Sequence, residues 1–385
     1  MYVESYFQTA AYLYEQYDLQ KPLPIFLKEY FKQNKKFGSR DRKFIAELLY
    51  GIYRLGRKDT TLSVKERMLI GAFLSKRLPL LFFEKTNANM ASLYDSSFMA
   101  RRKWIEENYQ ILFTMPYTCS DGISVDDYLQ NLFSQPRFFI RIRKNKESII
   151  RKLKEKEITY TEESDTCLSF DVDTKLSDLF PAGDIVIQDW SSQKTGDFWH
   201  PIASEKWWDC CAASGGKSIS LLDKNSKIDL TVSDIRPAIL NNLHTRMQQY
   251  AYGDKYVSHV LDLTKDILGF TNKKFDHIIC DVPCSGSGTW ARSPEQYYFF
   301  NEELLSNFQI KQYTIAKNAI SYLKPNGYMF YITCSVFAAE NENIIERLKS
   351  ENLVDMVSAQ LINGTERKAD CLFVAVLKKS IIASR

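Results

Sequence analysis

Apolar segments of strand length alternate with segments of helical periodicity from about residue 185 to the end of the chain. The expected strands are 206–210, 228–233, 258–261, 275–281, 327–333 and 371–378. The expected helices between them are 218–222, 237–250, 302–323 and 340–349. This alternation predicts an α/β fold with a parallel, doubly wound, Rossmann-like sheet, which binds its ligands at the carboxyl ends of the strands.

Two further regions precede this one, and the chain length of 385 residues leaves room for them. Residues 1–128 carry helical stripes, such as the apolar positions between Phe44 and Ile52. Residues 129–184 show a different pattern, with strand-like segments expected at 138–143 and 167–172 on either side of a charged helix at 147–156. We therefore expect domains at 1–128 (all-α), 129–184 (small α+β) and 185–385.

The positive charge of the chain is concentrated in two runs, although the formal net charge is only +4. Residues 32–43 hold six basic side chains and one acidic, and residues 137–156 hold nine basic and two acidic. A solvated surface is one interpretation of each run. Aromatic residues interleave with both runs, which favours a polyanionic partner such as RNA.

The cysteines and the N-terminus indicate the compartment. No apolar run approaches the ~20 residues that span a bilayer, and the N-terminus lacks the pattern of a secretory signal. The eight cysteines have no zinc-ligand spacing. We expect reduced thiols in a cytoplasmic protein, a monomer without metal or membrane partner.

The segment 209–218, Asp-Cys-Cys-Ala-Ala-Ser-Gly-Gly-Lys-Ser, follows an expected strand and opens an expected helix. A phosphate-binding P-loop would need glycine at position 211, where Cys211 stands. A nucleoside ligand fits better, because Asp234 and Asp262 end the next two strands and acids at strand tips suit ribose hydroxyls and amino groups. S-adenosylmethionine is a ligand of this kind.

Two cysteines also lie at expected strand ends. Cys284 follows a strand in Asp281-Val-Pro-Cys, and Cys334 ends another in Thr333-Cys-Ser. A single cysteine at such a place is usually structural. Two of them beside a nucleoside pocket favour covalent chemistry.

Methylation of cytosine explains the need for a thiol. A thiolate that adds to ring carbon 6 turns carbon 5 into a nucleophile, and a carboxyl such as Asp281 can supply the proton or hydrogen bond at ring nitrogen 3. An unperturbed thiol is mostly protonated at neutral pH, so a cation such as Lys217 would help to ionise it. Chemistry alone does not rank Cys284 and Cys334. DNA cytosine methyltransferases resemble a pattern with the nucleophile after a proline, which would favour Cys284.

Together the motifs resemble a family, the bacterial 16S ribosomal RNA cytosine-5 methyltransferases (Sun/RsmB-like, with a NusB-like N-terminal domain). The segment 209–218 is similar to the cofactor loop of that family, and 281–288 with Arg292-Ser-Pro-Glu to its proline-cysteine motif. Thr333-Cys-Ser with Glu340-Asn-Glu is similar to the last catalytic motif. The segments 186–192 and 37–51 resemble the lead-in to the catalytic domain and a NusB-like helix entry.

The resemblance implies a Rossmann-like S-adenosylmethionine-dependent methyltransferase sheet, preceded by an all-α NusB-like RNA-binding domain and a small α+β RNA-binding unit. It implies that Cys334 is the nucleophile and that Cys284 assists product release, with Asp281 as the third catalytic residue. S-adenosylmethionine would be bound by Cys211, Ala212, Ala213, Ser214, Gly215, Gly216, Lys217, Asp234, Asp262 and Asp281. The substrate would be a cytosine of ribosomal RNA, unstacked to reach the sheet edge.

Several positions depart from the family pattern. Ser214 stands where the family has proline, Arg143 replaces an asparagine, and Ala291 replaces an arginine. The last strand reads Cys371-Leu-Phe-Val instead of a Gly-Phe-Phe pattern. Transfer RNA cytosine-5 methylation and a non-catalytic RNA-binding assembly factor are the alternatives. An amino-group methyltransferase is disfavoured, because Asp281-Val-Pro-Cys is not an Asn/Asp-Pro-Pro-Tyr-like strand end.

Overall fold

The computed structural model describes residues 2–56, 61–176, 179–181, 183–267 and 269–380. They form two compact units that do not follow chain order. The helical unit contains Met1–Pro116, Ser124–Gln135 and Thr289–Asn301. The sheet unit contains Tyr117–Ile123, Pro136–Gly288 and Glu302–Arg385. The borders predicted from the sequence, at 128 and 184, stay predictions.

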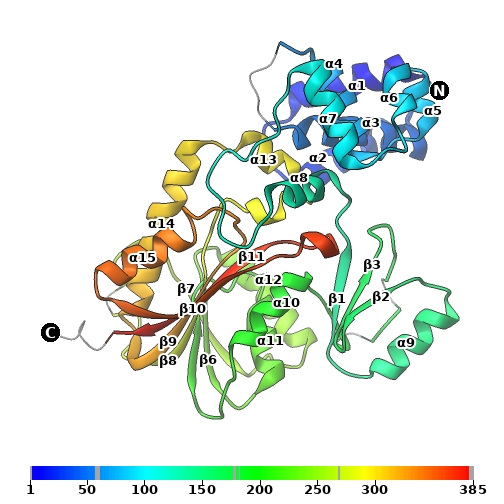
Figure 1. Cartoon of the computed structure of the whole chain (residues 1–385). Helices are drawn as coiled ribbons and strands as arrows, with labels where there is room; N and C mark the ends of the chain where they lie inside the picture. Colours follow the sequence, from blue (N-terminus) through cyan, green and yellow to red (C-terminus); the bar gives the residue numbers. More distant parts are fainter. Residues whose placement is uncertain (1, 57–60, 177–178, 182, 268, 381–385) are drawn as a thin grey trace. The chain divides into compact units, whose positions relative to one another are not determined.

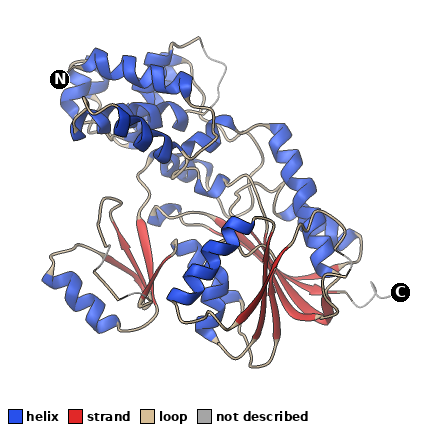
Figure 2. Ribbon diagram, turned by 180° about the vertical axis from the view of Figure 1, so that it is seen from behind, coloured by secondary structure: helices blue, strands red, loops and turns tan. Residues whose placement is uncertain are grey.

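Every regular element among the described residues of the helical unit is a helix, which confirms the all-α prediction for the N-terminal region (Figure 2). Its helices are α1 (Val3–Gln16), α2 (Leu23–Gln33), α3 (Ser39–Arg54), α4 (Val64–Ser75), α5 (Leu80–Glu84), α6 (Ala88–Ser92), α7 (Phe98–Tyr109), α8 (Val125–Phe133) and α13 (Pro294–Phe299). Helix α4 begins with a capping box, in which the Glu66 amide donates to the Ser63 hydroxyl and the Ser63 amide to the Glu66 carboxylate.

Helix α13 enters the helical unit from far along the chain. The Tyr298 ring packs at 5.3 Å from the Tyr53 ring, and its hydroxyl lies 2.6 Å from that of Tyr14. The buried Glu295 carboxylate accepts from the Leu23 amide at 3.4 Å. The sequence prediction kept this segment with the sheet, whereas its aromatic residues are part of the core of the helical unit.

The first part of the sheet unit is a small antiparallel sheet with the order β2-β3-β1-β4 and one helix. Its elements are β1 (Phe138–Ile142), α9 (Lys146–Glu155), β2 (Thr161–Ser164), β3 (Cys167–Phe170) and β4 (Ile185–Ile187). Strands β1 and β3 and helix α9 match the expectation. Strands β2 and β4 had no signal, because one is polar and the other has three residues.

The main sheet has seven strands in the order β10-β11-β9-β8-β5-β6-β7. Its strands are β5 (Lys206–Asp209), β6 (Asp229–Asp234), β7 (Tyr256–Val260), β8 (Phe275–Asp281), β9 (Leu323–Thr333), β10 (Val354–Ile362) and β11 (Leu372–Lys379). Its helices are α10 (Trp190–Lys194), η1 (Thr195–Phe198), α11 (Gly216–Lys224), α12 (Pro237–Gln249), η2 (Ser287–Thr289), α14 (Glu302–Ile320), α15 (Glu342–Ser350) and η3 (Thr365–Arg367).

Five neighbouring strands, β9-β8-β5-β6-β7, are parallel, as predicted. The prediction of a parallel sheet was wrong on one side of the sheet, where β11 runs antiparallel to both β9 and β10. Strand β10 was missed because it is an edge strand whose residues 355–360 are exposed, so its sequence lacks an apolar run.

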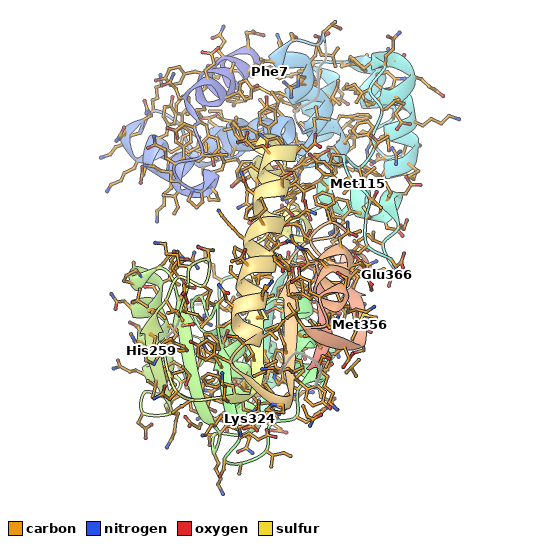
Figure 3. The ribbon with its side chains drawn as sticks, turned by 90° about the vertical axis from the view of Figure 1, so that its left-hand side faces the viewer. Phe7, Met115, His259, Lys324, Met356 and Glu366 are labelled. Atoms are coloured by element: carbon orange, nitrogen blue, oxygen red, sulfur yellow. The ribbon has the colours of Figure 1, made fainter. Side chains whose placement is uncertain are left out.

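Helices cover both faces of the main sheet, α11 and α12 on one and α14 and α15 on the other (Figure 1). Adjacent residues of β5 show the two cores, since Trp207 packs with the α11–α12 side and Trp208 with the α14–α15 side. Figure 3 shows α14 along the sheet, with Lys324 at the edge where β9 begins. The candidate site lies at the opposite border of the sheet, at the carboxyl ends of the parallel strands.

Among the residues that the structure describes, no helix is both long and apolar enough to cross a membrane.

Helices α3 and α4 cross at two glycines, and this crossing gives a stability prediction. A methyl group on Gly71 would lie 2.0 Å from the backbone oxygen of Gly51, so the helices would have to move apart. We expect Gly71→Ala to lower the free energy of unfolding of the helical unit by roughly 2 kcal/mol. Urea unfolding followed by circular dichroism measures the loss. Lys32→Ala, at an exposed helical position, is the control, and equal stability of both variants would contradict the close packing.

Candidate active site

The predicted site residues are carried by the loops that follow five parallel strands. Because the carboxyl ends of parallel strands meet at one edge, these loops are neighbours. In sheet order the residues are Cys334 after β9, Asp281 and Cys284 at the end of β8, Asp209 with the loop 210–217 after β5, Asp234 at the end of β6 and Asp262 beyond β7.

The loop after β5 is held in a tight turn. Ala213 and Gly215 have positive φ angles of 45° and 83°, a region that favours glycine. The Ala213 amide donates to Asp234 Oδ2 at 3.0 Å, which ties the loop to β6. Arg246 donates to both the backbone oxygen and the hydroxyl of Ser214 at 2.8 Å. The residue that departs from the family's proline is therefore fixed by a side chain of α12.

Asp234 is buried and anchored on several sides. Its carboxylate accepts from the Ala213 amide and from the backbone and guanidinium of Arg236, at 3.0–3.2 Å. Burial opposes the charge, but the Arg236 hydrogen bonds outweigh it and lower the pKa of Asp234. Asp262 lies two residues beyond β7 and binds the Thr264 amide and hydroxyl, which lowers its pKa.

Lys217, in the first turn of α11, forms an ion pair with Asp281 at the end of β8. The distance between Lys217 Nζ and Asp281 Oδ2 is 2.5 Å. Burial alone would lower the pKa of Lys217, but the charge and hydrogen bond of Asp281 raise it. Lys217 thus pairs with Asp281 and also interacts electrostatically with Cys334, and its expected role in ionising a thiol stays a prediction.

The two strand-end cysteines lie side by side. The distance between Cys284 Sγ and Cys334 Sγ is 3.3 Å, and both side chains are partly exposed. The hydrogen bond with Cys334, followed by burial, raises the pKa of Cys284 well above its usual value. Gly288 closes the loop behind them, since its amide donates to the Cys334 backbone oxygen at 2.8 Å and a methyl group there would lie 1.9 Å from the Cys371 oxygen.

Glu340 is the residue whose importance the sequence did not reveal. The sequence motif that contains Glu340 gives it no role, yet it is fully buried and accepts hydrogen bonds from Ser285, Ser335 and Gln312. The spacing of Glu340-Asn-Glu after Thr333-Cys-Ser was the only available signal. Four of the other six cysteines, Cys167, Cys210, Cys280 and Cys371, are buried like apolar residues, whereas Cys119 and Cys211 are partly exposed.

Comparison with known proteins shows which family the catalytic part of the chain resembles. Residues 198–374 match the family model described as 16S rRNA methyltransferase RsmB/F. The ribosomal RNA small subunit methyltransferase B of Xanthomonas campestris pv. campestris is 28% identical over 167 residues, which are 43% of this chain and 38% of that protein. The chain therefore spans less than half of the length of this curated relative.

Two solved structures share the fold. The crystal structure of PH0851 has a TM-score of 0.68 at 18% identity and covers 94% of this chain and 95% of that one. The structure of NSun6 from Pyrococcus horikoshii with SFG has a TM-score of 0.58 at 14% identity, with 66% and 94% covered. At these identities the likeness shows the fold alone, a Rossmann-like sheet together with an all-α region, as predicted.

Asp209 gives the site a pH-dependent contribution to stability. Burial raises the pKa of Asp209 to about 7, although Ser218 donates to Oδ2 at 2.6 Å. Its Oδ1 has no hydrogen-bond partner among the described residues. An unfolded aspartate has a pKa of ~3.9, so the folded chain binds more protons between pH 4 and 7 and the free energy of unfolding falls as pH rises through this range.

Asp209→Asn removes this titration and keeps an oxygen for Ser218. Relative to the wild type, the variant should gain up to about 4 kcal/mol in free energy of unfolding between pH 4 and pH 8. Urea unfolding followed by tryptophan fluorescence at both pH values measures the difference. The exposed Asp173→Asn is the control. A difference between Asp209→Asn and the wild type that stays the same at both pH values would show that Asp209 is ionised throughout.

Proposed function

We propose that the protein transfers a methyl group from S-adenosylmethionine to carbon 5 of a cytosine in 16S ribosomal RNA, because residues 198–374 match the family model described as 16S rRNA methyltransferase RsmB/F. The observation that carries the proposal is the pair of thiols, 3.3 Å apart, at the ends of β8 and β9. Asp281 and the loop after β5 lie at the same sheet edge.

The loop after β5 fits a nucleoside cofactor. A methyl group on Gly216 would meet no atom within 4 Å, so there is open space at the start of α11. Backbone amides at a helix start suit the carboxylate of an amino-acid moiety. Asp234 and Asp262 would receive the ribose hydroxyls and the amino group, with the loop 211–217 and Asp281 completing the pocket. The cofactor supplies an electrophilic methyl group, and the relative solved with SFG, an analogue of S-adenosylmethionine, is consistent with this pocket.

Cys334 would add to carbon 6 of the cytosine and so make carbon 5 nucleophilic. The raised pKa of Cys284, caused first by its hydrogen bond with Cys334 and then by burial, supports this ranking of the thiols. Asp281 holds the ammonium of Lys217, so the pair can provide the hydrogen bond at ring nitrogen 3. After methylation the carbon 5 proton leaves to a base, the bond from Cys334 to carbon 6 breaks, and Cys284 would assist this release.

Exposed cations support an RNA substrate. In the run 32–43 the lysines and Arg40 are exposed on the helical unit. The cations of the run 137–156 fall into two groups. Arg141 and Arg143 form ion pairs with Asp223 at 2.7 Å. Arg151, Lys154 and Lys156 are exposed. The RNA contacts proposed for the second run therefore come from the exposed Lys144, from α9 and from its end.

The two thiols give the most direct test. Cys334→Ala should lose methyl transfer to small-subunit ribosomal RNA by at least about 1,000-fold, because no adduct can form. Cys284→Ala should accumulate a covalent protein–RNA adduct, because release fails. Labelled S-adenosylmethionine and denaturing gels measure both, and Cys167→Ala, a thiol of the small sheet, is the control.

The same assay separates the alternatives. An adduct trapped by Cys334→Ala instead would reverse the two roles. Transfer to transfer RNA in preference to ribosomal RNA would favour that substrate class. RNA binding by the wild type without transfer to any RNA would favour the non-catalytic assembly factor, and label on adenine would contradict cytosine chemistry.

The basic run of the helical unit gives a binding prediction. Lys35→Glu with Lys36→Glu should weaken binding to ribosomal RNA and make the slope of log K against log salt shallower by about 2, if each lysine contacts one phosphate. Filter binding between 50 and 200 mM salt measures the slope. Lys85→Glu with Lys103→Glu reverses two exposed charges elsewhere in the same unit. Equal effects of the two pairs would point to net charge and not to a binding surface.

A further inference from the structure

The loops that carry the two thiols are joined through one buried carboxylate. Glu340 has no solvent exposure, and it accepts from the Ser285 amide at 2.8 Å and from the Ser285 hydroxyl at 2.5 Å. It also accepts from the Ser335 hydroxyl at 2.5 Å. Ser285 follows Cys284 and Ser335 follows Cys334 in the chain, so one side chain binds the neighbours of both thiols.

Further hydrogen bonds hold Glu340 in place. Gln312, in the middle of α14, donates to Glu340 Oε1 at 2.9 Å and to the Pro283 backbone oxygen at 3.0 Å. Tyr331 of β9 donates to the backbone oxygen of Glu340 at 2.7 Å. Gln312 of α14 therefore holds the carboxylate and Tyr331 of β9 holds the backbone of the same residue, and both supports are buried.

The next residue holds the other side of the Cys334 loop. Asn341 accepts from the Thr333 hydroxyl at 2.5 Å and donates to the Ser335 backbone oxygen at 2.9 Å. Cys334 is thus flanked by two residues that are both bound to the segment 340–341. The serine hydroxyls close the network, since Ser287 lies 3.0 Å from Ser335 and 3.1 Å from Ser285.

A charge in such a place has a cost unless it is matched by donors. A buried carboxylate is stable only when its lone pairs are satisfied, and here four donors converge on its two oxygens. Any movement of one thiol loop away from the other would break bonds to a buried charge. The network therefore resists changes in the distance between the two sulfur atoms.

We propose that Glu340 is a positioning residue, which sets the spacing of Cys284 and Cys334 by binding Ser285 and Ser335 at the same time. The inference rests on the proposed function, because that spacing matters when one thiol attacks and the other assists release. Glu340 itself touches neither the base nor the cofactor in this assignment. Its effect on the reaction passes through the two loops.

Two variants and a matched control test the role. In Glu340→Ala the loops lose their common acceptor, and we expect kcat to fall roughly 100-fold with little change in the KM for S-adenosylmethionine, because a displacement of about 1 Å has this effect on positioned groups. Glu340→Gln keeps the shape and one acceptor oxygen, so it should recover part of the rate. Glu346→Gln, an exposed position on α15, should behave as the wild type.

A second readout needs neither RNA nor cofactor. Diamide removes two electrons and two protons from a pair of adjacent thiols, forming a disulfide and the hydrazine. The wild type should form the Cys284–Cys334 disulfide rapidly, and both Glu340 variants should form it more slowly, with the pair identified by peptide mass spectrometry. Thermal unfolding by circular dichroism confirms that the variants are folded, and Glu340→Gln carries the test if Glu340→Ala does not fold.

The outcomes are distinguishable. A kcat near that of the wild type in Glu340→Ala would overturn the positioning role, and so would a rate of disulfide formation that neither variant changes. A wild type that methylates no RNA would overturn the proposed function alone. In that case the disulfide rates of the three folded proteins still decide whether Glu340 sets the spacing of the thiols.

Discussion

The candidate site depends on one partly buried ion pair, between Lys217 and Asp281. Lys217 stands in the first turn of α11, where the helix dipole disfavours a cation, so it needs a carboxylate beside it. Asp281 ends β8, the strand next to β5, and supplies that carboxylate at 2.5 Å. The pair joins the start of α11 to the end of β8, so a shift of the cofactor loop relative to the thiol loop would stretch or break it. The loop proposed to bind the cofactor and the loop that carries Cys284 thereby keep their relative position.

The location of the site could be predicted from the sequence, because acids and thiols at the ends of apolar strands must share an edge once those strands are parallel. The elements that were missed lack such a signal. Strand β10 is an exposed edge and β2 is polar, so neither shows an apolar run. The antiparallel direction of β11 depends on how the chain returns to the sheet, and no local pattern of its residues indicates it.

The remaining differences between the sequence prediction and the structure concern residues whose partners lie far away along the chain. Arg141 and Arg143 belong to a basic run, yet both pair with Asp223, about 80 residues away along the chain. Counting charges along the chain cannot separate cations that hold the fold from cations that remain exposed. Glu340 is a similar case. Its role depends on Ser285 and Gln312, which approach it only after β8, β9 and α14 have packed.

The two thiols cannot both ionise freely, because their sulfur atoms lie so close together. Two sulfur atoms 3.3 Å apart cannot both be ionised without strong repulsion, so one of them keeps its proton. The negative charge of Glu340 acts on Cys284 and raises its pKa further, after the hydrogen bond with Cys334 and burial. The protonated form of Cys284 is thus favoured, in keeping with the proposal that Cys334 is the nucleophile. Chemistry read from the sequence had left this choice open, and the positions of neighbouring charges now favour one side of it.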